Sequence, residues 1–186
     1  MKKSYTLHIC GLERQLPLVM ISDNVQIASF VILGDVELTV ACAGELIQHA
    51  PDFDVLITAE AKGIPLVHEI ARQMGIPKYI IARKSKKAYM EEPSSARLSS
   101  ITTNNEQQLF LDKADAEYMK GKRVLIVDDV VSTGESLRAM QNLVSSCDGK
   151  IVSCLAILAE GAAKSRDDII YLEYLPLFDR QGKPLS

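Results

Sequence analysis

Two adjacent acids follow a strongly apolar segment beyond the middle of the chain. Residues Val124–Val127 form an unbroken apolar run, which is typical of a parallel strand buried on both faces. Asp128 and Asp129 come directly after this run. Paired carboxylates at a strand end are hydrogen-bond acceptors, so they suit the cis hydroxyls of a sugar.

The loop after the two acids has the composition of an anion site. It holds hydroxyls, a glycine and one further acid, and its residues are Ser132, Thr133, Gly134, Glu135 and Ser136. A helical apolar pattern starts at Leu137, and the first N–H groups of a helix lack intrahelical partners, so a phosphate fits there. The nucleoside-triphosphate pattern Gly-x-x-x-x-Gly-Lys-Ser/Thr is absent. Acids and loop together predict a ribose 5-phosphate site; the alternative is a strand-turn-helix whose polar side chains only cap the helix.

Positive charge follows two other apolar segments. Lys62 and Gly63 come shortly after the run Asp54–Ala59, and the basic run at 83–87 reads Arg-Lys-Ser-Lys-Lys. Cations and free N–H groups at strand ends suit a diphosphate, whereas surface charge and a solvated basic turn are the ordinary interpretations. The place of the basic run, beside the predicted anion loops, favours a functional role.

Apolar segments alternate with helical patterns along most of the chain. Strands are predicted at 54–59, 78–83, 124–127, 151–158 and 169–172, and helices at 37–50, at 63–74 and from 137. This alternation predicts an α/β fold with a doubly wound, mostly parallel sheet. Because ligands bind outside the carboxyl ends of parallel strands, we expect Glu60, Arg83 and Asp128 to converge at one edge.

The length of 186 residues predicts a single domain over 1–186, with a core at about 28–160. Residues 1–30 and 161–186 are expected to pack together as a small hood over the sheet edge. The long polar stretch at 85–105 predicts a lid that shields the site from water, and an exposed hairpin is the alternative.

The composition argues against several other classes of protein. A net charge of −3 leaves no basic footprint for nucleic acid, and no apolar run is long enough to span a membrane. The N-terminus has no continuous signal-peptide core, so we expect a cytoplasmic protein. The cysteines lack metal-ligand spacing and are expected to stay reduced, with a catalytic thiol as the alternative; they are Cys10, Cys42, Cys147 and Cys154.

The stretch Arg123–Leu137 resembles the 5-phosphoribosyl-1-pyrophosphate (PRPP) binding motif of the type I phosphoribosyltransferases, and most of all that of the adenine and xanthine enzymes. The resemblance implies the type I fold and a magnesium-dependent salvage reaction. In that reaction PRPP and a purine base, adenine-like by this resemblance, give a nucleoside 5′-monophosphate and pyrophosphate. It also implies a homodimer. Asp128 and Asp129 would hold the ribose hydroxyls, and residues 132–136 the 5′-phosphate.

The same resemblance assigns the positive segments to pyrophosphate. Ala61, Lys62 and Gly63 correspond to the family's short loop, which usually reads acid-Ser-Arg-Gly, so Ala61 replaces Ser and Lys62 replaces Arg. This loop often contains a cis non-prolyl bond, which the resemblance places at Glu60–Ala61. The segment at 83–87 is similar to Val-Arg-Lys-x-x-Lys of the adenine enzymes, which implies that pyrophosphate also contacts Arg83, Lys84 and Lys87. Mg²⁺ would be held through PRPP and water rather than by the protein.

The base site and the catalytic acid carry less sequence information. The apolar hood and the segment after Leu158, Ala-Glu-Gly-Ala-Ala, suit a flat base, with Val25 and Ile27 as base contacts. The adenine enzymes place a lid Glu near the leaving base, but the equivalent place here is Ile101–Asn104, so Glu106 is the candidate acid. Two alternatives stay open: a PRPP- or nucleotide-sensing regulator without turnover, and an enzyme acting on orotate or another non-purine.

Overall fold

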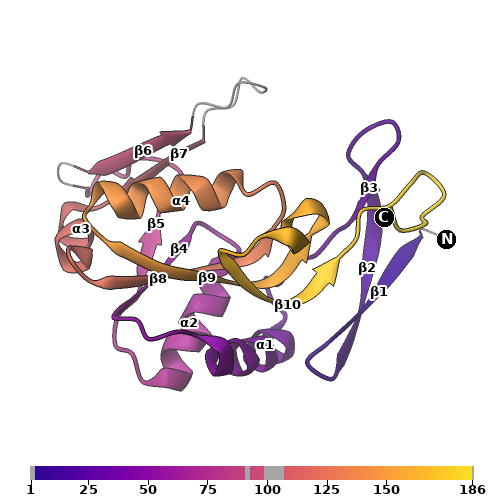
Figure 1. The fold of residues 1–186 in the computed structure, drawn as a ribbon, viewed down its shortest axis with the longest axis horizontal. Coiled ribbons are helices and arrows are strands. Elements are labelled where there is room, and N and C mark those ends of the chain that lie inside the picture. Colours follow the sequence, from indigo (N-terminus) through magenta and orange to yellow (C-terminus); the bar gives the residue numbers. More distant parts are fainter. Residues whose placement is uncertain (1–2, 91–92, 99–106, 186) are drawn as a thin grey trace.

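A five-stranded parallel sheet forms the centre of the molecule (Figure 1). The computed structural model describes residues 3–90, 93–98 and 107–185. The strand order is β10-β9-β8-β4-β5, and neighbouring strands pair in parallel. The strands are β4 (Val55–Ala59), β5 (Ile80–Ala82), β8 (Arg123–Val131), β9 (Lys150–Glu160) and β10 (Ile169–Leu175). The predicted doubly wound, mostly parallel sheet is therefore confirmed.

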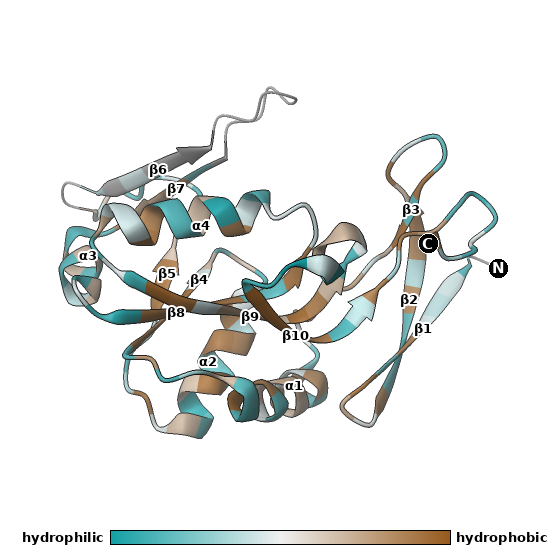
Figure 2. Ribbon diagram, viewed as in Figure 1, coloured by the Kyte–Doolittle hydropathy of each residue, from teal (hydrophilic) through white to brown (hydrophobic). Residues whose placement is uncertain are grey.

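Helices cover both faces of this sheet (Figure 1). One face carries α1 (Val36–His49) and α2 (Gly63–Met74), and the other carries α3 (Lys113–Met119) and α4 (Glu135–Ser146). Successive residues of β8 point to opposite faces of the sheet and contribute to two hydrophobic cores. Leu125 belongs to the core with α1 and α2, and Ile126 belongs to the core with α4. Figure 2 shows the same division, with apolar residues along the strands and polar residues on the outer helix faces. In the described ranges, no helix is both long and apolar enough to cross a membrane.

An antiparallel sheet of three strands forms the hood beside the central sheet (Figure 1). Its strands are β1 (Ser4–Ile9), β2 (Leu12–Met20) and β3 (Gln26–Ala28). The C-terminal segment joins it, because the backbones of Gln26 and Phe178 exchange hydrogen bonds of 2.7 and 2.9 Å. The C-terminal segment also contacts the start of the described chain, because Lys3 Nζ donates to the carbonyl of Gln181, and Figure 1 shows this segment beside the hood strands. Residues 169–175 pair with β9 and so belong to the central sheet, and only the segment after Leu175 returns to the hood.

Several elements differ from the sequence pattern. The apolar run predicts a strand that ends at Val127, whereas β8 continues through both aspartates to Val131 because β9 pairs with it along that length. Helix α3, the short 3-10 helix η1 (Gly161–Ser165) and the three hood strands were not anticipated individually. Their apolar residues are too few or too irregularly spaced for a periodic signal.

The predicted lid at 85–105 contains β6 (Ser94–Leu98), which forms an antiparallel ribbon with β7 (Gln107–Leu111) just beyond it. The ribbon starts from the central sheet, since Arg83 and Phe110 exchange backbone hydrogen bonds of 2.9 and 2.8 Å. This pairing matches the hairpin alternative in form. Closure of the segment over a ligand stays a prediction, because residues 99–106 lie outside the described part of the chain.

Candidate active site at the carboxyl edge of the sheet

The carboxyl ends of β4, β5 and β8 lie next to one another. Ala59 is in register with Ala82, and Thr58 with Val127. The N–H of Glu60 donates to the carbonyl of Ala82 across this edge at 2.9 Å. The loops that follow the three strands therefore start from one place, as expected for an open parallel sheet.

The predicted phosphate loop forms a small cradle at the start of α4. A cavity of about 100 Å³ lies there, and its lining includes four of the five predicted loop residues: Ser132, Thr133, Gly134 and Ser136. Glu135 is the exception, and its side chain is exposed. Gly134 begins the helix with φ of 78°, a left-handed conformation that favours glycine. The cavity is the size of a small anion, and the N-terminal N–H groups of α4 give it hydrogen-bond donors.

The two adjacent aspartates have different surroundings. Asp128 lines the phosphate cradle and accepts a 2.9 Å hydrogen bond from the N–H of Asp129. The Asp129 side chain is only 5% exposed, and its Oδ2 lies 3.1 Å from Lys62 Nζ. Apart from this ion pair, the buried oxygen has no hydrogen-bond donor among the described residues. Burial and the charge of Asp129 raise the pKa of Asp128 to about 7.

The loop after β4 is built on a tight turn. The Glu60–Ala61 peptide bond is cis, as the family resemblance implied. Helix α2 starts immediately after Lys62, at the buried residue Gly63. A Cβ at Gly63 would overlap Thr58 Oγ1 and would lie 3.3 Å from the carbonyl of Val127. Only glycine lets the helix start this close to the ends of β4 and β8.

The basic run after β5 is organised by a single carboxylate. Glu60 lies 3.2 Å from Arg83 Nη1 and 3.9 Å from Lys87 Nζ. The Glu60 oxygen that faces Lys87 is Oε2, and it also accepts a 3.1 Å hydrogen bond from the backbone N–H of Lys84. The expected convergence of the loop after β4 with the basic run is thus present, and an anion of higher charge could replace Glu60 as its partner.

A second, larger cavity adjoins the cradle. It has a volume of about 330 Å³ and shares Val130 and Ser132 with the phosphate cradle. Ile27 lines it, whereas Val25 does not. The lining also includes Glu160, from the segment after Leu158 that the sequence associates with the base, and three residues that sequence reasoning did not single out: Ser29, Phe30 and Leu175. The hood and the ends of β9 and β10 meet only in the folded chain, so no local pattern reveals this set.

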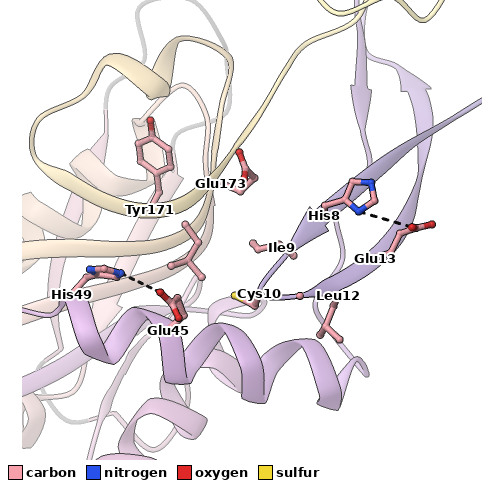
Figure 3. A pocket seen from close by; sticks show the side chains of 11 residues that line it. His8, Ile9, Cys10, Leu12, Glu13, Glu45, His49, Tyr171 and Glu173 are labelled. Atoms are coloured by element: carbon pink, nitrogen blue, oxygen red, sulfur yellow. Dashed lines mark hydrogen bonds and ion pairs between the residues drawn. The ribbon is translucent and has the colours of Figure 1, made fainter.

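A larger cavity lies elsewhere in the described structure. It measures about 710 Å³ and is bounded by the β1–β2 turn, α1 and β10 (Figure 3). Two histidine–glutamate pairs line it, His8 with Glu13 at 3.9 Å and His49 with Glu45 at 3.3 Å. It contains none of the predicted site residues, and its carboxylates, including that of Glu173, do not suit a phosphorylated ligand.

Two further predictions concern single residues. Glu106, the candidate catalytic acid, and its neighbours Ile101–Asn104 lie outside the described residues. The cysteine alternative loses support, because burial raises the pKa of the Cys42 and Cys154 thiols and disfavours the reactive thiolate.

Fold and site together define an α/β protein with a small polar cradle at the carboxyl edge of its parallel sheet. The family model for the phosphoribosyl transferase domain matches residues 41–183. The chain therefore belongs to the phosphoribosyltransferase family, in agreement with the PRPP motif of its sequence.

Relatives with known names differ in the base that the names specify. A hypoxanthine/guanine phosphoribosyltransferase of a Methanocaldococcus species is 31% identical over 144 residues, which cover 77% of this chain and 67% of that protein. The protein of the same name from Methanocella arvoryzae is 32% identical over 145 residues, covering 77% and 69%. The crystal structure of adenine phosphoribosyltransferase from Thermoanaerobacter pseudethanolicus superposes with a TM-score of 0.69 at 20% identity, covering 86% of this chain and 95% of that one. The structural match supports the fold.

Proposed function

We propose that this protein transfers a 5-phosphoribosyl group from PRPP to a purine base. The C1–oxygen bond to the diphosphate breaks as a ring nitrogen of the base bonds to C1 and releases its proton. The products are a nucleoside 5′-monophosphate and pyrophosphate. The observation that carries the proposal is the set of groups at one sheet edge that match the parts of PRPP: the phosphate cradle, the carboxylate of Asp128 and the basic run around Glu60.

Each part of PRPP has a matching group in this set. The 5′-phosphate fits the cradle at residues 132–136, and Asp128 accepts from the ribose hydroxyls. Asp129 positions Lys62, because its carboxylate forms an ion pair with the Lys62 ammonium at 3.1 Å. The pyrophosphate is held by the loop at residues 61–63 and by Arg83, Lys84 and Lys87, which exchange Glu60 for the stronger anion. Most of the rate gain then comes from orientation and from fixed charges.

The magnesium requirement of such a reaction agrees with the donor set. Among the described residues, no group of three or more His, Cys, Asp or Glu side chains is arranged to hold a metal ion. The edge offers Asp128, whereas Oδ2 of Asp129 already lies 3.1 Å from the ammonium of Lys62. Mg²⁺ suits such a site because it keeps several waters and takes its other ligands from substrate phosphates. When bound, it offsets the charge of the departing pyrophosphate.

The base occupies the cavity of about 330 Å³ between hood and sheet. Ile27 and Phe30 offer apolar contact to a flat ring, and the buried Glu160 offers a carboxylate to an N–H donor. The family motif favours adenine, whose 6-amino group is such a donor. A second candidate is a 6-oxopurine. Guanine presents two neighbouring hydrogen-bond donors, which a single carboxylate can accept, whereas adenine presents one donor beside an acceptor.

Pyrophosphate release measured with PRPP and Mg²⁺ across adenine, guanine, hypoxanthine, xanthine and orotate tests the proposal. We expect turnover with at least one purine and none with orotate. Glu160→Gln keeps the size of the side chain and removes its charge, so it should raise KM for the base while leaving KM for PRPP within about twofold. Binding of PRPP without turnover of any base would contradict the proposal and favour the regulator.

A further inference from the structure

Arg166 lies beside Gly134, a lining residue of the phosphate cradle, while the arginine itself stands outside that lining. It follows η1, far from the PRPP motif in sequence. A Cβ at Gly134 would lie 2.6 Å from Arg166 Nη1 and 3.4 Å from its Cζ. The guanidinium therefore covers the glycine at which α4 begins.

Its orientation is determined by two polar neighbours. Nε and Nη2 donate to the two carboxylate oxygens of Asp168 at 2.8 and 2.6 Å. Asp168 in turn accepts a 3.0 Å hydrogen bond from Gln141, which lies on α4. The helix that carries the cradle thus holds the carboxylate that aligns the arginine, and Nη1 is the nitrogen left toward Gly134. With 26% of its side chain exposed, Arg166 keeps access to water and to a ligand.

The cradle has no cation of its own. The five residues 132–136 include one charged side chain, that of Glu135, and it is negative. Two other cations of the edge are engaged elsewhere, Lys62 with Asp129 and Arg83 with Glu60. A phosphate monoester with up to two negative charges would otherwise meet only N–H dipoles and hydroxyls next to two aspartates.

We propose that Arg166 is a binding residue for the 5′-phosphate, with Asp168 and Gln141 as its positioning residues. This inference rests on the proposed function, since it assigns the cradle to the phosphate of PRPP. A charge-assisted hydrogen bond from a pre-aligned guanidinium contributes more than a neutral one. The role belongs to the 5′-phosphate alone, because Arg166 lies at the α4 end of the site and the pyrophosphate groups follow β4 and β5.

Calorimetry of ribose 5-phosphate and of pyrophosphate binding tests this role. Arg166→Gln should weaken ribose 5-phosphate by about tenfold or more and change pyrophosphate affinity by less than about twofold. Arg166→Lys should recover part of the loss, because it restores the charge without the fork of donors. The matched control is Arg138→Gln, which removes the same charge from an exposed position on α4 and should change neither affinity appreciably.

Two results would overturn the assignment. Unchanged ribose 5-phosphate affinity in a folded Arg166→Gln variant is one, and an equal loss for both ligands together with a lowered Tm is the other, because it indicates a purely structural brace. If the wild-type protein binds neither ribose 5-phosphate nor PRPP, the proposed function fails along with the inference. If the wild type binds and turns over while Arg166→Gln matches it, only the inference fails.

Discussion

Asp128 and Asp129 illustrate how two identical neighbours acquire different tasks at the scale of the residue. Asp129 is buried against Lys62, and its charge is compensated. Asp128 faces the cradle, where burial and the neighbouring carboxylate raise its pKa to about 7. The folded protein therefore binds a proton at Asp128 over a pH range in which an unfolded aspartate, with a pKa of about 3.9, has lost it.

This shift predicts a pH-dependent effect of Asp128→Asn on stability. Below the unfolded pKa, the protonated Asp128 contributes its full stabilisation to the folded state. As the pH rises from about 4 to about 7, the wild type loses this stabilisation, because the unfolded aspartate releases its proton more readily than the folded one. The uncharged Asn avoids that loss. The free energy of unfolding of the variant should rise relative to wild type by on the order of 2 kcal/mol across this range and stay level above it.

Urea unfolding at about pH 5 and about pH 8 measures this difference. Glu117→Gln is the control, because it makes the same chemical change at an exposed position of α3. A difference between Asp128→Asn and wild type that does not change with pH would mean that Asp128 titrates as an ordinary surface acid.

At the scale of the element, the start of α2 depends on a close approach between backbone and side chain. Gly63 lies over Thr58, whose buried Oγ1 has no hydrogen-bond partner among the described residues. The same packing holds the loop at residues 60–62 against the sheet, so the helix start and the pyrophosphate loop are one structural unit.

Gly63→Ala should therefore destabilise the protein by about 1–3 kcal/mol and weaken pyrophosphate binding, since the new methyl group displaces α2 from the strand end. Gly44→Ala is the matched control. Gly44 lies within α1, its Cβ would meet only the end of the Gln73 side chain at 3.3 Å, and helix propensity favours alanine there by up to about 1 kcal/mol.

Thr58→Ala combined with Gly63→Ala tests the cause, because removing the hydroxyl makes room for the methyl group. Urea unfolding and calorimetry should show partial recovery of both properties in the double variant. Equal behaviour of Gly63→Ala and Gly44→Ala would show that α2 accommodates the methyl group without displacement.

At the scale of the whole molecule, the two ligands of the proposed reaction use different parts of the structure. The residues proposed to bind phosphate and pyrophosphate follow strands of the central sheet. Ile27 and Phe30 of the base cavity come instead from the hood and the segment after it. Phe178 links the hood to the C-terminal segment: it is 1% exposed, contacts the ring of Tyr5 with centroids 5.2 Å apart, and pairs with Gln26.

Phe178→Ala should loosen the hood and so raise KM for the base several-fold more than KM for PRPP. It should also lower stability by about 3 kcal/mol or more, because it leaves a cavity in the core. Phe178→Leu fills much of that space and should show a smaller change in both. Steady-state kinetics with PRPP and base varied separately measures the split, and an equal rise in both KM values would contradict a hood that serves the base alone.

Local patterns in the sequence were sufficient for the central sheet and for the strand, loop and helix start that form the cradle. An apolar run, two acids and a loop of small residues leading into a helical stripe lie within fifteen consecutive positions, so periodicity and side-chain chemistry identify them without tertiary information. The family resemblance likewise depends on contiguous residues, including those around the cis bond at Glu60–Ala61.

Only the tertiary structure decided how these segments are completed. Arg166 reaches Gly134 because η1 returns over the start of α4, and Glu160 meets Phe30 in one cavity because the hood folds over the strand ends. Asp128 and Asp129 differ because β8 continues past them and gives each carboxylate its own surroundings. Contacts between residues far apart in the chain leave no periodic signal, since they depend on the packing of whole elements rather than on local spacing.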